Sequence, residues 1–238
     1  MMRKLIILKA GSKLPSLAQT RGDFEEWILE PMALDEGQYE VISVNPTAHL
    51  PHLSKVAGVV VTGSSAMVTD ASDWIEQSAQ WLKAAVEEGI PVLGICFGHQ
   101  LLAHALGGKV LDNPAGIEVG TVITRLHAAA EDDPLFRSLP TALPVQASHK
   151  QAVLSLPAQA VRLASSDMDN NHAFRYGQRA WGVQFHPEFS CDIVRAYIEY
   201  YAEALSVQGV DHQALFETSQ ETRPSQQVLL RFARLVFP

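Results

Sequence analysis

The sequence predicts an α/β fold: a doubly wound, mostly parallel sheet with helices on both faces. In the first half of the chain, short runs that are apolar on both faces alternate with segments of helical periodicity. That alternation is the pattern of βαβ units, and strands buried on both faces are typical of a parallel sheet. The length of 238 residues fits one large domain of this class, or one domain with a small appendage.

The elements of the first half follow from periodicity and capping. A helix is expected at 23–29, where apolar residues recur at i, i+3 and i+4, and it should end before Pro31. A second helix is expected at 72–88, with Ser72 as its N-cap and Gly89 beyond its end. The strands that these helices connect are expected at 5–8, 39–44, 56–61 and 91–95.

The second half has a different pattern, with short strands separated by turn residues. Together these predict an antiparallel excursion or a mixed sheet edge. The expected strands are 119–126, 143–147, 161–165, 173–176 and 180–185, and a helix at 193–205 follows them. Beyond Gly209 the chain is polar, Pro224 interrupts it, and 226–236 carries an apolar helical stripe. We therefore divide the chain into a domain of residues 1–205 and a C-terminal helical extension, 206–238, which packs on the body or docks a partner.

Composition and charge exclude several classes of protein. The formal net charge is −8, and no Lys/Arg cluster resembles a phosphate-binding patch, so we expect no nucleic-acid partner. The apolar run near the N-terminus is too short for a signal sequence, and no run approaches the ~18 residues that span a bilayer. We expect a cytoplasmic protein without a membrane partner, and no disulfide between Cys96 and Cys191.

The segment around Cys96 predicts a nucleophile. An expected strand ends at residue 95 and a helical pattern starts near Gln100, so Cys96 lies in a sharp strand-to-helix turn. Gly94 and Gly98 on either side allow such a turn. The thiol then lies at a helix N-terminus, where free N–H groups and the helix dipole favour the thiolate.

The partners of this nucleophile are expected ninety residues later. His186 and Glu188 follow an expected strand, and residues two apart on an extended segment face the same side. An imidazole base and a carboxylate that orients it are what an activated cysteine requires. We therefore predict a catalytic triad of Cys96, His186 and Glu188.

These two segments resemble the signatures of the class I glutamine amidotransferases, G-x-C-x-G-x-Q around the nucleophile and H-P-E around the histidine. Pro187 completes the second signature. The resemblance covers about residues 1–205 and is strongest to the glutaminase domain of GMP synthase and to free-standing relatives such as γ-glutamyl peptidases. It implies a flavodoxin-like sheet and an enzyme that acts on γ-glutamyl amides.

The resemblance also implies an oxyanion hole formed by the backbone N–H groups of Gly63 and Phe97. The family usually has G-G-P at the first of these positions, whereas this chain has Thr62-Gly63-Ser64. Gly63, whose amide is required, is retained. The sequence alone does not determine the geometry of the loop around it. Such donors stabilise a developing oxyanion by several kcal/mol.

The same resemblance assigns a set of residues to the glutamine pocket. The first of them lies one helical turn after the nucleophile and is expected to bind the α-amino acid end of glutamine. The pocket residues are Gln100, Glu118, Gly120, Ser148 and His149. No Cys/His/Asp cluster has metal-ligand spacing, so no metal site is expected.

We expect hydrolysis of the γ-amide of glutamine through a γ-glutamyl thioester, releasing ammonia and glutamate without a cofactor. No P-loop or other glycine-rich phosphate loop is present, so any synthetase would be a separate subunit. Two alternatives stay open. The chain is a stand-alone hydrolase of γ-glutamyl amides or peptides, or a non-catalytic binding or regulatory protein on the same scaffold.

Overall fold

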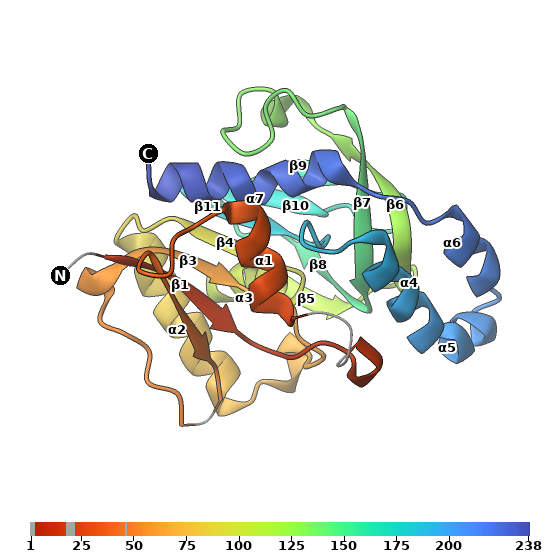
Figure 1. The fold of residues 1–238 in the computed structure, drawn as a ribbon, viewed down its shortest axis with the longest axis horizontal. Coiled ribbons are helices and arrows are strands. Elements are labelled where there is room, and N and C mark those ends of the chain that lie inside the picture. The colour runs from red at the N-terminus through yellow and green to blue at the C-terminus, as the bar shows by residue number, and fades with distance from the viewer. Residues whose placement is uncertain (1–2, 18–21, 46) are drawn as a thin grey trace.

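A computed structural model describes residues 3–17, 22–45 and 47–238 of the chain (Figure 1). Its centre is a nine-stranded sheet. In spatial order the strands are β2 (Tyr39–Ser43), β1 (Lys4–Lys9), β3 (Val56–Val61), β4 (Val92–Ile95), β11 (Ala180–Val183), β10 (Ala173–Tyr176), β9 (Ala160–Ser165), β6 (Glu118–Leu126) and β7 (Ala142–His149). The strands from β2 to β11 are parallel, and the pairs from β11 to β7 are antiparallel. The predicted α/β class with a doubly wound sheet and an antiparallel excursion is confirmed.

Helices cover both faces of the parallel part. Along β1, Leu5 and Ile7 belong to one apolar core and Ile6 and Leu8 to another, because successive side chains of a strand point to opposite faces. The first core includes residues of α1 (Phe24–Met32) and α7 (Arg223–Val236), and the second includes residues of α2 (Asp73–Glu87) and α3 (Phe97–Ala105). Burial on both faces explains the continuous apolar runs of β1, β3 and β4, whereas the edge strand β2 has no buried residue.

Prolines end helices less sharply here than the sequence predicts. Helix α1 was expected to end before Pro31, but it continues to Met32 and ends at Ala33, which adopts the left-handed conformation (φ 52°). In the last turn a proline disrupts the helix less than in its interior. Pro224 lies in the first turn of α7, where its missing N–H would have had no intrahelical acceptor.

Several elements escaped prediction. Strands β5 (Lys109–Asp112) and β8 (Gln151–Ser155) form a separate antiparallel pair. Helix α6 (His212–Thr218) lies within the polar stretch and begins at Asp211, whose carboxylate accepts from two N–H groups of the first turn. Short 3₁₀ helices occupy Pro15–Leu17, Leu53–Lys55, Val68–Asp70 and Ala128–Ala130.

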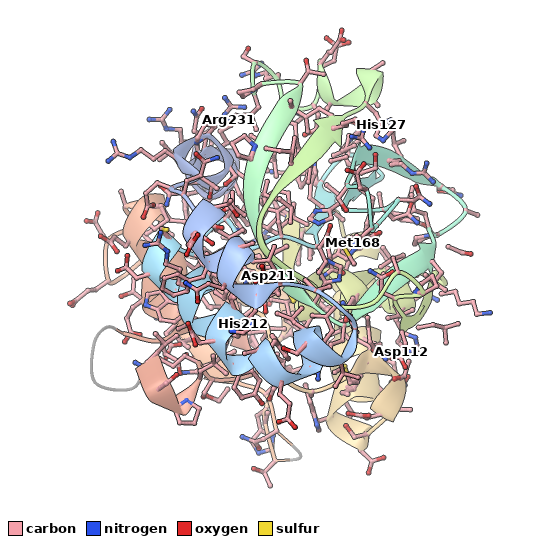
Figure 2. All side chains as sticks on the ribbon, turned by 90° about the vertical axis from the view of Figure 1, so that its right-hand side faces the viewer. Asp112, His127, Met168, Asp211, His212 and Arg231 are labelled. Atoms are coloured by element: carbon pink, nitrogen blue, oxygen red, sulfur yellow. The ribbon has the colours of Figure 1, made fainter. Side chains whose placement is uncertain are left out.

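The C-terminal helices pack on two different parts of the sheet. Helices α4 (Cys191–Tyr200), α5 (Ala202–Val207) and α6 lie at the end of the molecule beside β6 and β7, and Figure 2 looks onto this face, with Asp211 and His212 marking the start of α6. Helix α7 lies alongside α1 and contributes Val228, Leu229 and Phe232 to the first core. No helix in the described part of the chain is long and apolar enough to cross a membrane.

Candidate active site

Cys96 occupies the turn between β4 and α3. It is the N-cap of α3 and has φ 51° and ψ −102°. A non-glycine residue in such a conformation is strained by about 1–3 kcal/mol, and this strain is common at functional sites. The side chain is buried except for 6% of its surface, and Sγ lies 3.6 Å from the carbonyl oxygen of Ser148 at the end of β7.

The two flanking glycines make this turn possible by close backbone approach. A Cβ on Gly94 would lie 2.3 Å from the carbonyl oxygen of Gly98. A Cβ on Gly98 would lie 2.4 Å from the carbonyl oxygen of Val61 in β3. Helix α3 therefore starts directly against β3 and β4, which directs Cys96 out of the sheet at the C-terminal edge of the strands, where doubly wound sheets bind ligands.

The strand pairing explains how the distant histidine motif reaches Cys96. Strand β11 runs parallel to β4, and the N–H of Cys96 donates to the carbonyl of Val183, the last residue of β11. The chain then leaves the sheet beside Cys96, and the N–H of His186 donates to the carbonyl of Gln146 in β7. His186 is thus fixed between the two strands whose ends border the nucleophile.

His186 is paired and enclosed. Its Nδ1 lies 2.7 Å from Oε1 of Glu188, and both side chains are buried. The ring stacks on Phe189 at 3.9 Å between centroids, and Phe24 lies at 6.2 Å. Burial by itself would lower the pKa of His186, but the charges of Glu188 and Cys96 and hydrogen bonds to both raise this pKa to about 10. The sulfur and the carboxylate therefore both favour the protonated form of the ring.

The loop that contains Gly63 lies against this histidine. A Cβ on Gly63 would be 2.9 Å from Cε1 of His186. The hydroxyl of Thr62 donates to the carbonyl of Gly63 and accepts from the N–H of Ala10, and the hydroxyl of Ser64 donates to the carbonyl of Ala10. These hydrogen bonds fasten the loop to the end of β1 in place of a proline. Phe97 is the first residue of α3, so its N–H has no acceptor within the helix.

A small cavity of about 40 Å³ opens beside Cys96. Four of the residues assigned to the site from the sequence line it together with Cys96: Phe97, Gln100, Ser148 and His149. Nε2 of Gln100 donates to the carbonyl of Gln151 and to Oε1 of Gln184, and these two hydrogen bonds fix the orientation of the amide at the cavity. Gly63 adjoins His186, whereas Glu118 and Gly120 do not line this cavity.

Glu118 instead forms a buried network behind the cavity. Its Oε2 lies 2.8 Å from Nε2 of His149 and 3.0 Å from Nε2 of His172, and its Oε1 accepts from the hydroxyl of Ser166. Burial by itself would raise the pKa of Glu118, but the two histidines hold it well below its usual range. Gly120 (φ 114°) faces Ile198 of α4 and Leu215 of α6.

The same three groups are the one set of potential metal ligands that we find in the described residues. The donor atoms of Glu118, His149 and His172 lie within 4.8 Å of one another. Their separations from Oε2 are hydrogen-bond distances, and Nδ1 of His149 lies 2.9 Å from the carbonyl oxygen of Gln151. We interpret the cluster as a hydrogen-bonded network that orients His149 at the rim of the cavity.

Several side chains that line this cavity were not predicted from the sequence. Lys150 and Tyr201 line the cavity beside Cys96. Lys150 directly follows the assigned residues Ser148 and His149, and this adjacency was the available signal. Tyr201 lies between α4 and α5, and only the packing of α4 against β6 and β7 brings it to the nucleophile.

Comparison with known proteins agrees with this architecture. The sequence matches the family model of class I glutamine amidotransferases over residues 23–198. A glutamine amidotransferase from Thermotoga maritima has the same fold, with a TM-score of 0.76, 24% identity and full coverage of both chains. The chain belongs to the class I glutamine amidotransferase family.

Two kinds of curated relative are similar to the chain. Gamma-glutamyl peptidase 5 of Arabidopsis thaliana is 35% identical over 62% of this chain and 59% of its own length. One subunit of the glutamine-hydrolysing GMP synthase of Archaeoglobus fulgidus is 35% identical over 66% of this chain and 82% of its own length. The GMP synthase of Porphyromonas gingivalis is 35% identical over 79% of this chain, which spans only 33% of that protein.

Replacing Gly98 by alanine should damage the fold itself. The new Cβ would meet a backbone carbonyl at 2.4 Å, which cannot move without shifting β3, so we expect the free energy of unfolding to fall by about 3 kcal/mol or more. Gly37→Ala is the matched control, because a Cβ there meets nothing within 4 Å. Chemical denaturation measures both, and equal stabilities of the two variants would contradict the close approach.

Replacing Glu118 by glutamine should test the buried network. The change removes the negative charge that faces two buried imidazoles and replaces one of the two acceptor oxygens by an NH2 donor, so we expect a loss of about 3 kcal/mol in the free energy of unfolding near pH 6. Because the pKa of Glu118 is lower in the folded than in the unfolded state, its contribution is present above about pH 4.5 and is lost as the pH falls.

The difference in stability between the wild type and Glu118→Gln should therefore shrink in acid. Glu87→Gln changes an exposed carboxylate on α2 and is the control, with no expected effect. A Glu118→Gln variant as stable as the wild type at pH 6 would show that the network contributes nothing.

Proposed function

We propose that the chain hydrolyses the γ-amide of glutamine through a γ-glutamyl thioester on Cys96. The observation that carries this proposal is the position of Cys96 in a strained turn, in contact with an imidazolium that is itself paired with a buried carboxylate. That arrangement of nucleophile, base and orienting group is the one required for covalent catalysis of acyl transfer.

The reaction follows from the positions of these groups. The Cys96 thiolate attacks the γ-carbonyl carbon, and the N–H groups of Gly63 and Phe97 hold the oxyanion. His186 gives its proton to the leaving nitrogen, the C–N bond breaks, and ammonia departs. The neutral imidazole then takes a proton from water, which attacks the thioester and releases glutamate. Glu188 keeps the ring oriented through Nδ1 in both steps.

The fate of the ammonia distinguishes two forms of this proposal. By analogy with the Archaeoglobus fulgidus protein, the chain would supply ammonia to a separate synthetase subunit. By analogy with the Arabidopsis thaliana peptidase, it would act on γ-glutamyl peptides. One observation favours the second form: Thr62 and Ser64 fasten the Gly63 loop to β1, so the oxyanion hole is held in place without a partner. The paired Cys96, His186 and Glu188 argue against a purely regulatory protein.

Cys96 should be the site of covalent labelling by a diazo-ketone analogue of glutamine. Cys191 is the control, because burial raises the pKa of its thiol and its side chain does not line the cavity at Cys96. We expect mass spectrometry to show one label, lost in Cys96→Ser and retained in Cys191→Ser. Labelling of Cys191 in the folded protein, or no labelling at all, would refute the assignment.

The pH dependence of kcat/KM should report the His186–Glu188 pair. Because the His186 imidazolium is the proton donor and its pKa is raised to about 10, activity should persist until the pH approaches 10 and then fall. Glu188→Gln removes the carboxylate that raises this pKa, so the alkaline limb should move to lower pH.

Glu30→Gln is a suitable control for that profile. Glu30 and Glu188 line one pocket, separate from the cavity at Cys96, but the side chain of Glu30 is exposed. Its alkaline limb should match that of the wild type. An alkaline limb that is the same in Glu188→Gln as in the wild type would contradict the pairing as the source of the raised pKa.

A further inference from the structure

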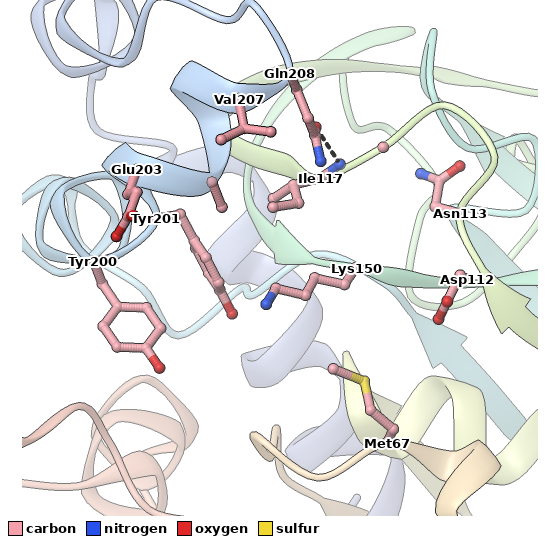
Figure 3. A pocket seen from close by; sticks show the side chains of 12 residues that line it. Met67, Asp112, Asn113, Ile117, Lys150, Tyr200, Tyr201, Glu203, Val207 and Gln208 are labelled. Atoms are coloured by element: carbon pink, nitrogen blue, oxygen red, sulfur yellow. Dashed lines mark hydrogen bonds between the residues drawn. The ribbon is translucent and has the colours of Figure 1, made fainter.

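A second and much larger cavity adjoins the one at Cys96. Its volume is about 790 Å³, and three side chains line both cavities: Met67, Lys150 and Tyr201 (Figure 3). The remainder of its wall comes from β5, the approach to β6, and the end of α4 with α5. Ammonia, the group released from glutamine, has no need of such a space, whereas a leaving amino acid would occupy a cavity of this size.

Lys150 stands at the junction of the two cavities. It lies in the turn between β7 and β8, two residues from Ser148, whose carbonyl oxygen contacts the Cys96 sulfur. Its Nζ lies 4.9 Å from the ring centroid of Tyr201, and Figure 3 shows the ammonium pointing toward this ring. Among the described residues no carboxylate forms an ion pair with Lys150.

Tyr201 provides a neutral wall beside this cation. Burial together with the nearby Cys96 raises the pKa of its hydroxyl to about 12, so the hydroxyl stays protonated and uncharged at neutral pH. The carboxylates of Asp112 and Glu203 line the larger cavity but not the one at Cys96. Of the charged side chains that line the larger cavity, the one that also lines the cavity at Cys96 is therefore the cation Lys150.

We infer that the larger cavity is the subsite for the amino acid released from a γ-glutamyl dipeptide, and that Lys150 binds the α-carboxylate of this amino acid. The inference rests on the proposed function of Cys96 and specifies its substrate. In such a dipeptide the carboxylate carbon is only two bonds from the scissile nitrogen. The group that recognises it must consequently stand at the entrance of the nucleophile cavity, where Lys150 is.

The side chain of the leaving residue would extend into the rest of the cavity. There it meets apolar groups from Ile117 and Val207 and the carboxylates of Asp112 and Glu203. The chemistry is balanced with the groups already described: the sulfur–carbon bond forms, the amide C–N bond breaks, and His186 protonates the departing α-amine. Water then cleaves the thioester, so the products are glutamate and one free amino acid.

The test compares substrates that differ only in this carboxylate. We would measure kcat/KM for γ-glutamyl-alanine, for γ-glutamyl-alaninamide and for glutamine. The wild type should prefer the free acid to its amide by about tenfold, the effect of one charge-assisted contact. Lys150→Met should abolish most of this preference, and Lys150→Arg should retain part of it.

Lys83→Met is the matched control, because Lys83 is an exposed lysine of α2 that lines neither cavity. It should keep the full preference. A preference unchanged in Lys150→Met would overturn the inference. So would an equal loss on the acid and the amide, which would place Lys150 at the glutamyl end of the substrate.

These measurements distinguish a failure of the dipeptide subsite from a failure of the proposed function. If the wild type hydrolyses glutamine but not γ-glutamyl-alanine, the chemistry of Cys96 stands and the dipeptide subsite is refuted. If it hydrolyses none of the three substrates and no thioester forms, the proposed function fails and the subsite with it.

Discussion

The turn between β4 and α3 brings backbone atoms closer together than any side chain at positions 94 and 98 would allow. The helix consequently starts directly at the end of the strand, and the residue between them is forced to positive φ. That residue is Cys96, whose sulfur is raised above the sheet edge toward β7. The other groups of the site surround this sulfur.

The remaining parts come from strands that end beside this turn. The hydrogen bond from Cys96 to Val183 joins the turn to β11, so the chain that follows β11 delivers His186 and Glu188 to the sulfur. The end of β7 supplies the Ser148 carbonyl and Lys150, and the Glu118 network holds His149 between them. The parallel half of the sheet thus carries the nucleophile, and the antiparallel half shapes the space in front of it.

The local sequence pattern was sufficient to predict the buried strands and the two motifs. Strands buried on both faces appear as continuous apolar runs, and the glycines that flank Cys96 are visible in the sequence. The pattern was insufficient for β5 and α6, which are mostly exposed and therefore lack a strong apolar period. Glu118 was assigned to the substrate pocket from the family resemblance, and its buried network was not predicted because its partners His172 and Ser166 come from distant segments. Tyr201 was missed for the same reason: tertiary packing, which periodicity does not record, sets its place.

The most direct measurement is the mass of the enzyme quenched in acid during turnover of glutamine and of γ-glutamyl-alanine. A thioester mechanism predicts that both substrates leave the same adduct, one glutamyl group, on the peptide that contains Cys96, and that Cys96→Ser forms none. Turnover that persists in Cys96→Ser, or a glutamyl group on any other residue, would contradict the central claim.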